Sequence, residues 1–359
     1  MKLNLLFFAV LAVLTLGCKE SSENKTVFPE SEWESASPES QGIDKQSLHA
    51  AMAYLDSVCG EIGTSRSMVI KNGYVIWQGT DVESRHLVWS CTKSFMSTCL
   101  GLLWDDGKCT PETKAKKYFE KLEEDYPDVT IEHLAKFTSG YNHEEDDTFE
   151  PAEPDYTPGE AFHYSRQSDV LAYVLTMAGE ESLENLFKRR VASVIGITQE
   201  QMEWKENGEA NGLTLNGGAG MPVSGVYITA EAMARFGWLY CNNGNWNGQQ
   251  VVSQKYIDYA TSVRVAPGVP PYDPDAWYAG LLTGNYGLNW WVNGEKPDGT
   301  QMWPHAPEGT FAAQGNKNNI CLIVPAWNMV IVRIGGDENI GTDLYDGVFE
   351  RLAENFDNS

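Results

Sequence analysis

Ser90 and Lys93 are the two residues of this sequence whose types and spacing best suit nucleophilic chemistry. A serine hydroxyl is a weak nucleophile unless a nearby base removes its proton. A lysine amine can be that base when burial or a cationic neighbour keeps it uncharged. In a helix, residues three apart lie on the same face, so a Ser-x-x-Lys tetrad brings the two side chains together. The pair therefore predicts a serine nucleophile with a lysine base.

The residues around Ser90 and Lys93 are stronger evidence for a catalytic role than the spacing of the pair alone. Ser22-x-x-Lys25 has the same spacing, and a helix-capping serine with a solvent-reaching lysine would produce the tetrad without any chemistry. Residues 90–104, however, are mostly apolar and predict a buried helix that begins at Ser90. The free N–H groups at the start of such a helix favour a developing negative charge.

The elements that must position this helix predict an α+β fold. Apolar spacing indicates a helix over residues 44–58 capped by Asp44, and alternation around Asn72-Gly73 indicates a β-hairpin. Helical spacing returns at 229–241. The end of the chain predicts three strands and a closing helix, near 309–314, 319–324, 328–334 and 341–356. We therefore expect an antiparallel sheet made from both chain ends and flanked by helices.

The same pattern predicts how the chain is divided. Residues 40–109 and 226–359 would form the sheet-and-helix core, and residues 110–225 would form an inserted, mainly helical subdomain. Before the core, residues 1–18 have the apolar run of a secretory signal, and residues 19–39 form a polar stretch that predicts a tether.

The stretch that begins at Ser90 resembles the nucleophile helix of the serine β-lactamase and penicillin-binding-protein superfamily, in particular its esterase and 6-aminohexanoate-dimer hydrolase branch. Further segments resemble family landmarks in the family's order, and together they extend over about residues 40–355. They are LAKFTSGY at 134–141, PGEAFHYSRQSDVLAYVL at 158–175, the Gly-rich and helical run at 217–253, YGLNWWV at 286–292, and GTFAAQGNKNNICLIVP at 309–325.

The resemblance implies a role for several residues. Ser90 would be the acylated nucleophile, Lys93 its general base, and Tyr164 the tyrosine that passes the proton to the leaving group. The oxyanion hole would consist of the backbone N–H groups of Ser90 and Asn316. The implied fold is β-lactamase-like, and the implied reaction needs no cofactor.

Two positions depart from the family pattern. Arg166 stands where β-lactamases and peptidases have Asn, and Ala313-Gln314-Gly315 stands where they have Lys or His followed by Thr-Gly. The missing cation argues against carboxylate-bearing substrates, although Arg166 could supply a displaced positive charge. Gln314, Gly315 and His305 are the further candidates for substrate binding.

The sequence thus predicts a serine hydrolase that acts through an acyl-enzyme on a small carboxylic ester or amide. One alternative is a D-amino-acid peptidase or β-lactamase acting on cell-wall-like substrates. Another is a surface lipoprotein that binds glycan or peptide without catalysis.

Composition and targeting signals limit the remaining possibilities. The 359 residues are 42% hydrophobic and 21% charged, which is a globular composition. With a net charge of -24, the chain lacks the excess of basic residues that is typical of nucleic-acid-binding proteins. The apolar run ends at Gly17-Cys18 and resembles a bacterial lipobox, which predicts an extracytoplasmic lipoprotein held to a membrane only by a lipid on Cys18. A plain signal peptide is the alternative.

The other six cysteines show no CxxC motif or Cys/His cluster, so no metal site is predicted. Free buried thiols and disulfides both remain possible for them. The sequence leaves the oligomeric state open.

Overall fold

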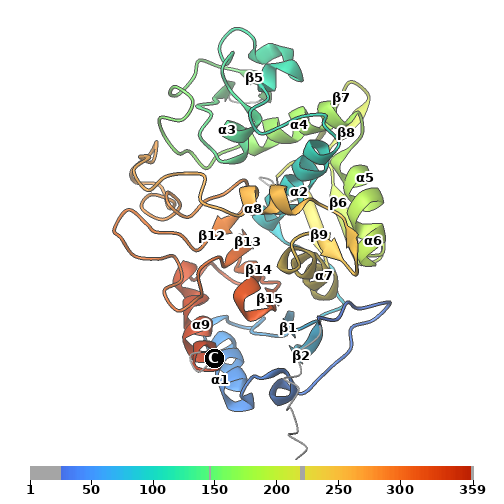
Figure 1. Ribbon diagram of the computed structural model, residues 1–359. Helices are drawn as coiled ribbons and strands as arrows, with labels where there is room; N and C mark the ends of the chain where they lie inside the picture. The colour runs from blue at the N-terminus through green and yellow to red at the C-terminus, as the bar shows by residue number, and fades with distance from the viewer. Residues whose placement is uncertain (1–25, 145–146, 219–222, 357–359) are drawn as a thin grey trace, which may run out of the picture.

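A six-stranded antiparallel sheet organises the chain (Figure 1). The computed structural model describes residues 26–144, 147–218 and 223–356. The strand order is β12-β13-β14-β15-β1-β2. These strands are β12 (Trp291–Val292), β13 (Phe311–Gly315), β14 (Asn319–Val324), β15 (Met329–Arg333), β1 (Ser67–Lys71) and β2 (Tyr74–Gln78). Both chain ends contribute to the sheet, which confirms the predicted α+β architecture.

The sheet is buried on both faces. Its central strands show this, because their apolar side chains point alternately to one face and to the other. In β14 and β15, Leu322 and Ile331 are paired in register and pack with α1 (Lys45–Val58) and α9 (Asp346–Ala353). Their neighbours Ile323 and Val330 point the other way, toward α7 (Ala230–Cys241). Successive side chains of a strand point to opposite faces, so apolar residues at every position require helices on both sides.

A second region is packed on the far side of α2 (Thr92–Asp105), the helix that begins just after Ser90 (Figure 1). Its helices are α3 (Ile131–Ala135), α4 (Gln167–Gly179), α5 (Leu183–Phe187) and α6 (Ser193–Ile195). Its strands are β3 (His86–Leu87), β9 (Gly225–Ile228) and β6 (Met202–Lys205) in one small sheet, with hairpins β4–β5 (His143–Glu144, Asp147–Pro151) and β7–β8 (Gly208–Ala210, Leu213–Leu215). Helices predominate here, but the short hairpins were not predicted.

The predicted hairpin and helices occur close to their expected bounds. Asn72 and Gly73 adopt φ values of 56° and 91°, which is the left-handed geometry that a two-residue turn between twisted strands needs. Asp44 caps α1 by accepting a hydrogen bond from the backbone N–H of Ser47. The closing helix α9 is shorter than expected because residues 342–344 form a separate 3-10 turn. The α-helix and hairpin not yet named are α8 (Gln254–Ala260) and β10–β11 (Asn245–Trp246, Gln249–Gln250).

The predicted tether is a partial exception, because residues 26–36 are attached to the body. Arg235, which is 2% exposed within α7, donates hydrogen bonds to the carbonyls of Glu30 and Ser31. Trp238 Nε1 donates to the carbonyl of Val27, and Ser35 forms a parallel bridge with Val75 of β2. A buried guanidinium needs acceptors, and this segment supplies them. The predicted signal and Cys18 lie outside the described residues.

Two further features concern the described residues only. None of their helices combines the length and apolar character needed to span a membrane. The six cysteines among them are buried and unpaired, so the disulfide alternative is not met.

Candidate active site

Ser90 lies in a one-turn 3-10 helix, Trp89–Cys91, that leads directly into α2. The turn is fastened to β9, because Val88 N–H donates to the Val226 carbonyl and Val226 N–H donates to the Thr92 hydroxyl. Trp89 has a φ of 50°, the left-handed region that bulky residues rarely adopt. Backbone strain of this kind concentrates at functional sites, where the surrounding structure holds it in place.

Lys93 lies one turn further along and faces the Ser90 hydroxyl. All but two of the 14 residues of α2 are buried, and Lys93 is only 3% exposed. Its Nζ lies 2.9 Å from Ser90 Oγ and 2.7 Å from the carbonyl oxygen of Gly218. The helix therefore brings the predicted nucleophile and the predicted base within hydrogen-bonding distance.

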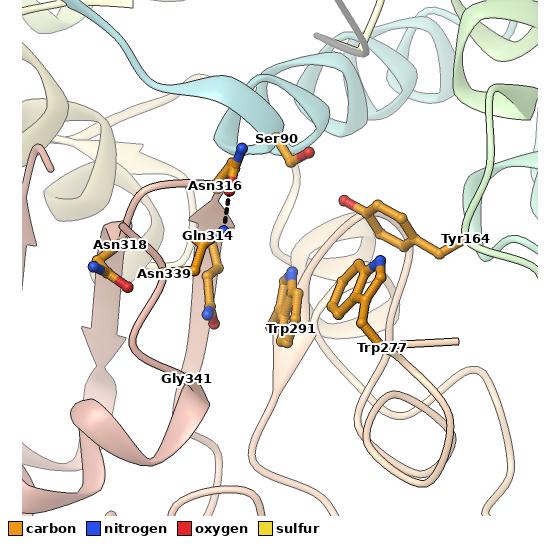
Figure 2. Close-up of a pocket in the computed structure, with 10 residues that line it drawn as sticks. Ser90, Tyr164, Trp277, Trp291, Gln314, Asn316, Asn318, Asn339 and Gly341 are labelled. Atoms are coloured by element: carbon orange, nitrogen blue, oxygen red, sulfur yellow. Dashed lines mark hydrogen bonds between the residues drawn. The ribbon is translucent and has the colours of Figure 1, made fainter. Parts of the chain in front are cut away.

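Tyr164 approaches the same point from the other region of the molecule. Its ring packs against Phe137 and Tyr286, and the Nζ of Lys93 lies 5.1 Å from the ring centroid. Figure 2 shows its hydroxyl and that of Ser90 pointing into one pocket. Burial raises the pKa of the neighbouring Tyr286 well above its usual value, so that phenol stays neutral beside Tyr164.

The end of β13 packs directly against the turn that carries Ser90. A Cβ on Gly315 would lie 2.2 Å from the Val88 carbonyl oxygen and 3.0 Å from the backbone nitrogen of Ser90, so only glycine permits this approach. The approach brings the next residue, Asn316, into the pocket wall with Ser90. The two predicted oxyanion-hole residues are thus on the same side of one cavity.

A loop over residues 336–341 is fastened to this strand end by asparagine side chains. Asn339 Nδ2 donates to Asn316 Oδ1, and the amide of Asn318 bonds to the backbone of Glu338 and Ile340 (Figure 2). Asn318, Asn339 and Gly341 consequently line the pocket. The sequence carried no periodic or motif signal for this loop.

The pocket has a volume of about 410 Å³ and an uncharged lining. One wall is aromatic: Trp277, which is 62% exposed, stacks on Trp291 with 6.3 Å between ring centroids. The side-chain oxygen of Gln314 is buried and has no hydrogen-bond partner among the described residues. The lining residues are Ser90, Tyr164, Trp277, Trp291, Gln314, Gly315, Asn316, Asn318, Asn339 and Gly341.

Two predicted substrate-binding residues do not line this pocket. Arg166 is turned onto Asp169, with 3.3 Å between its Nε and Asp169 Oδ2. The ring Nδ1 of His305 lies 2.8 Å from Asp346 Oδ2 on α9. Each side chain is thus held by a nearby carboxylate, and neither pairing was predicted from the sequence. Within the described ranges, no group of three His, Cys, Asp or Glu side chains is placed to hold a metal.

Comparison with known proteins agrees with this geometry. The Beta-lactamase family model matches residues 66–335, which include α2, the end of β13 and all of the pocket lining except Asn339 and Gly341. The chain belongs to the beta-lactamase family. This confirms the predicted resemblance and places the protein among hydrolases of the serine β-lactamase fold.

The chain is also similar to individual proteins. The 6-aminohexanoate-dimer hydrolase of Paenarthrobacter ureafaciens is 24% identical over 301 residues, covering 73% of this chain and 72% of the relative. A putative 6-aminohexanoate-dimer hydrolase structure from Bacillus anthracis has 19% identity and a TM-score of 0.65, covering 91% of this chain and 88% of that one. A family VIII carboxylesterase structure has 13% identity and a TM-score of 0.66, covering 91% and 100%.

Proposed function

We propose that the protein is a serine hydrolase that acts through an acyl-enzyme on a small, uncharged ester or amide. The observation that carries the proposal is the 2.9 Å separation between Lys93 Nζ and Ser90 Oγ at a pocket also lined by Tyr164. A buried amine beside a hydroxyl is the arrangement that activates a serine. Similar proteins named as a 6-aminohexanoate-dimer hydrolase and a family VIII carboxylesterase support this class of reaction.

The proposed reaction has two halves. In the first, Ser90 Oγ attacks the substrate carbonyl while Lys93 takes its proton, and the backbone N–H groups of Ser90 and Asn316 stabilise the oxyanion. Tyr164 then passes a proton to the departing alcohol or amine as the carbonyl–leaving-group bond breaks, and it recovers a proton from the protonated Lys93. In the second half, water attacks the acyl-enzyme and gives a proton to the same Lys93–Tyr164 pair, and that proton passes to Ser90 Oγ as the carboxylic acid leaves.

The lining of the pocket supports an uncharged substrate. It contains amide, hydroxyl and indole groups and no cationic side chain that could pair with a carboxylate. The Gln314 oxygen has no partner among the described residues and is able to accept a hydrogen bond, so a substrate N–H or hydroxyl near the acyl group suits it. The stacked Trp277 and Trp291 favour a flat or apolar leaving group. Arg166, paired with Asp169 outside this lining, gives no support to β-lactam or D-peptide substrates.

Labelling with a fluorophosphonate, followed by intact mass measurement, tests the proposal. The wild type should gain the mass of one phosphonyl group, and Ser90→Ala should gain none. Ser57→Ala, which changes an exposed serine on α1, is the matched control and should label like the wild type. Absence of an adduct on the wild type, or an adduct on Ser90→Ala, would contradict the proposal.

A substrate panel then tests the class. Neutral aryl esters and short amides should be hydrolysed at least tenfold faster than matched compounds with a carboxylate in the acyl part. Turnover of nitrocefin or a D-Ala-D-Ala peptide at comparable rates would instead support the β-lactamase or peptidase alternative. Binding of glycan or peptide without turnover of any member would support the non-catalytic one.

We also propose that the protein acts outside the cytoplasm and is anchored by a lipid on Cys18. The support is the apolar run that ends at Gly17-Cys18. Metabolic labelling with a fatty-acid analogue, compared between the wild type and Cys18→Ser, tests this location: the variant should lose the label.

A further inference from the structure

Arg166, the clearest departure from the family pattern, is the half-exposed end of a hydrogen-bonded network behind Lys93. Its partner Asp169 lies in the first turn of α4 and is only 3% exposed. Arg166 Nε lies 3.3 Å from Asp169 Oδ2. A buried carboxylate is costly unless it is paired and hydrogen-bonded, so this pair needs further partners.

The other carboxylate oxygen connects the pair to Lys93. Asp169 Oδ1 accepts from the backbone N–H of Gly218 at 3.3 Å and from Asn207 Nδ2 at 3.1 Å. The carbonyl of the same Gly218 accepts from Lys93 Nζ at 2.7 Å. One residue thus bonds Asp169 through its N–H and Lys93 through its carbonyl.

Close packing around Gly217 and Gly218 fixes this connection. A Cβ on Gly217 would lie 2.4 Å from Asp169 Oδ1, and one on Gly218 would lie 2.8 Å from Ser168 Oγ and 3.2 Å from Lys93 Cγ. Such distances leave no room for a side chain, so the two glycines let the backbone pass between α4 and α2.

We infer that Asp169, paired with Arg166, is a positioning residue that holds the Gly218 carbonyl against Lys93 and thereby keeps Lys93 Nζ facing Ser90. This inference rests on the proposed function, since it assigns a role within the same reaction. It also explains Arg166: the cation pairs with a buried carboxylate instead of binding substrate.

The charges near Lys93 make the inference testable by pH. Tyr164 faces Lys93 from the pocket, and Asp169 and Arg166 lie behind Gly218. Burial raises the pKa of the Cys91 thiol well above its usual value, so that neighbour stays neutral. Removing the charge of Asp169 disfavours the protonated amine, whereas removing the charge of Arg166 favours it.

The experiment measures the rate of fluorophosphonate labelling of Ser90 as a function of pH. Asp169→Asn keeps the shape of the side chain, and the rising limb of its profile should move to lower pH by about half a unit or more. The limb of Arg166→Gln should move to higher pH. Asp169→Ala, which frees the Gly218 N–H, should label about tenfold or more slowly at pH 7.

Glu132→Gln is the matched control because it removes the carboxylate of a partly buried ion pair outside the pocket lining, with Arg264 at 3.0 Å. Its labelling profile should equal that of the wild type, whatever its loss of thermal stability. Folded Asp169 and Arg166 variants that both keep the wild-type profile, or that shift it in the same direction, would overturn the inference. In either case the wild type still labels, whereas failure of the proposed function removes labelling of the wild type itself.

Discussion

The site consists of two groups of residues, which differ in how far their polar atoms are already paired. On the reaction side, which we define as Ser90, Lys93 and Gly218 with Asp169, each group is bonded to the next. On the recognition side, which we define as Gln314, Asn316 and Trp277, a buried oxygen has no partner among the described residues and an indole is largely exposed. The reacting groups are therefore fixed before a substrate binds, while the Gln314 oxygen and the Trp277 ring are left for the substrate to contact.

The largest effect should come from removing the base on the reaction side. Lys93→Met keeps an unbranched apolar stem in the buried site but cannot accept a proton, so hydrolysis of a neutral aryl ester should fall by about 10²–10⁴-fold. Steady-state kinetics and thermal unfolding check this together. Retention of more than a tenth of the activity by a folded variant would show that Lys93 is not the base.

The second-largest effect should come from changing Gly315, whose close contact with Ser90 joins the reaction side to the recognition side. Gly315→Ala places a methyl group against the Val88 carbonyl and the Ser90 nitrogen, so the strand end must move away from the nucleophile. A displacement of about 1 Å can cost about 10²-fold in rate. Gly268→Ala is the control, because a Cβ there meets nothing within 4 Å, and its kcat should not change. If the two variants are equally active, the close contact between Gly315 and Ser90 does not determine the position of the oxyanion-hole N–H groups.

A smaller effect is expected from the unpartnered acceptor of the recognition side. Gln314→Leu should raise KM by roughly three- to tenfold for esters with an N–H or hydroxyl in the acyl part, with little change in kcat. Esters without such a donor should bind the variant equally well. The exposed Gln254→Leu variant provides the control. If both classes of ester lose affinity alike, Gln314 contributes shape and not hydrogen bonding.

The smallest effect should come from the exposed indole. Trp277→Ala should raise KM for aryl esters by about two- to tenfold, as expected for the loss of one aromatic contact. Methyl esters, which cannot reach the stacked pair, should be unaffected. Because Trp277 is 62% exposed, the melting temperature should stay within about 1 °C of the wild type. A large loss with methyl esters would place Trp277 among the residues that shape the reaction side.

The same two sides differ in how much of them could be predicted from sequence. Ser90, Lys93 and Tyr164 lie in segments with strong local patterns, namely an apolar helix and a run that resembles a family landmark. Trp277 and Asn339 lie in irregular loops, which reach the pocket only because the sheet order brings distant segments together. Local periodicity contains no information about such contacts.

Two residues predicted to bind substrate do not line the pocket, and the physical reason is the same for both. Arg166 and His305 are each held by a carboxylate, Asp169 and Asp346 respectively. Arg235, in the middle of a predicted apolar helix, was the signal for the attached segment at 26–36, since a buried guanidinium requires acceptors. The sequence could show that a partner was needed but not which segment would provide it.

The attached segment at residues 26–36 also has a consequence for the proposed anchor on Cys18, because it fixes which end of the sheet lies nearest to the anchor. Thr26 and Val27 contact Asn328 and Asn72 at the β1–β2 and β14–β15 turns, and the register of β14 puts these turns at the opposite end of the sheet from Gly315. If a lipid on Cys18 holds the chain as proposed, the pocket lies at the end of the sheet away from Thr26, on the side opposite the attachment.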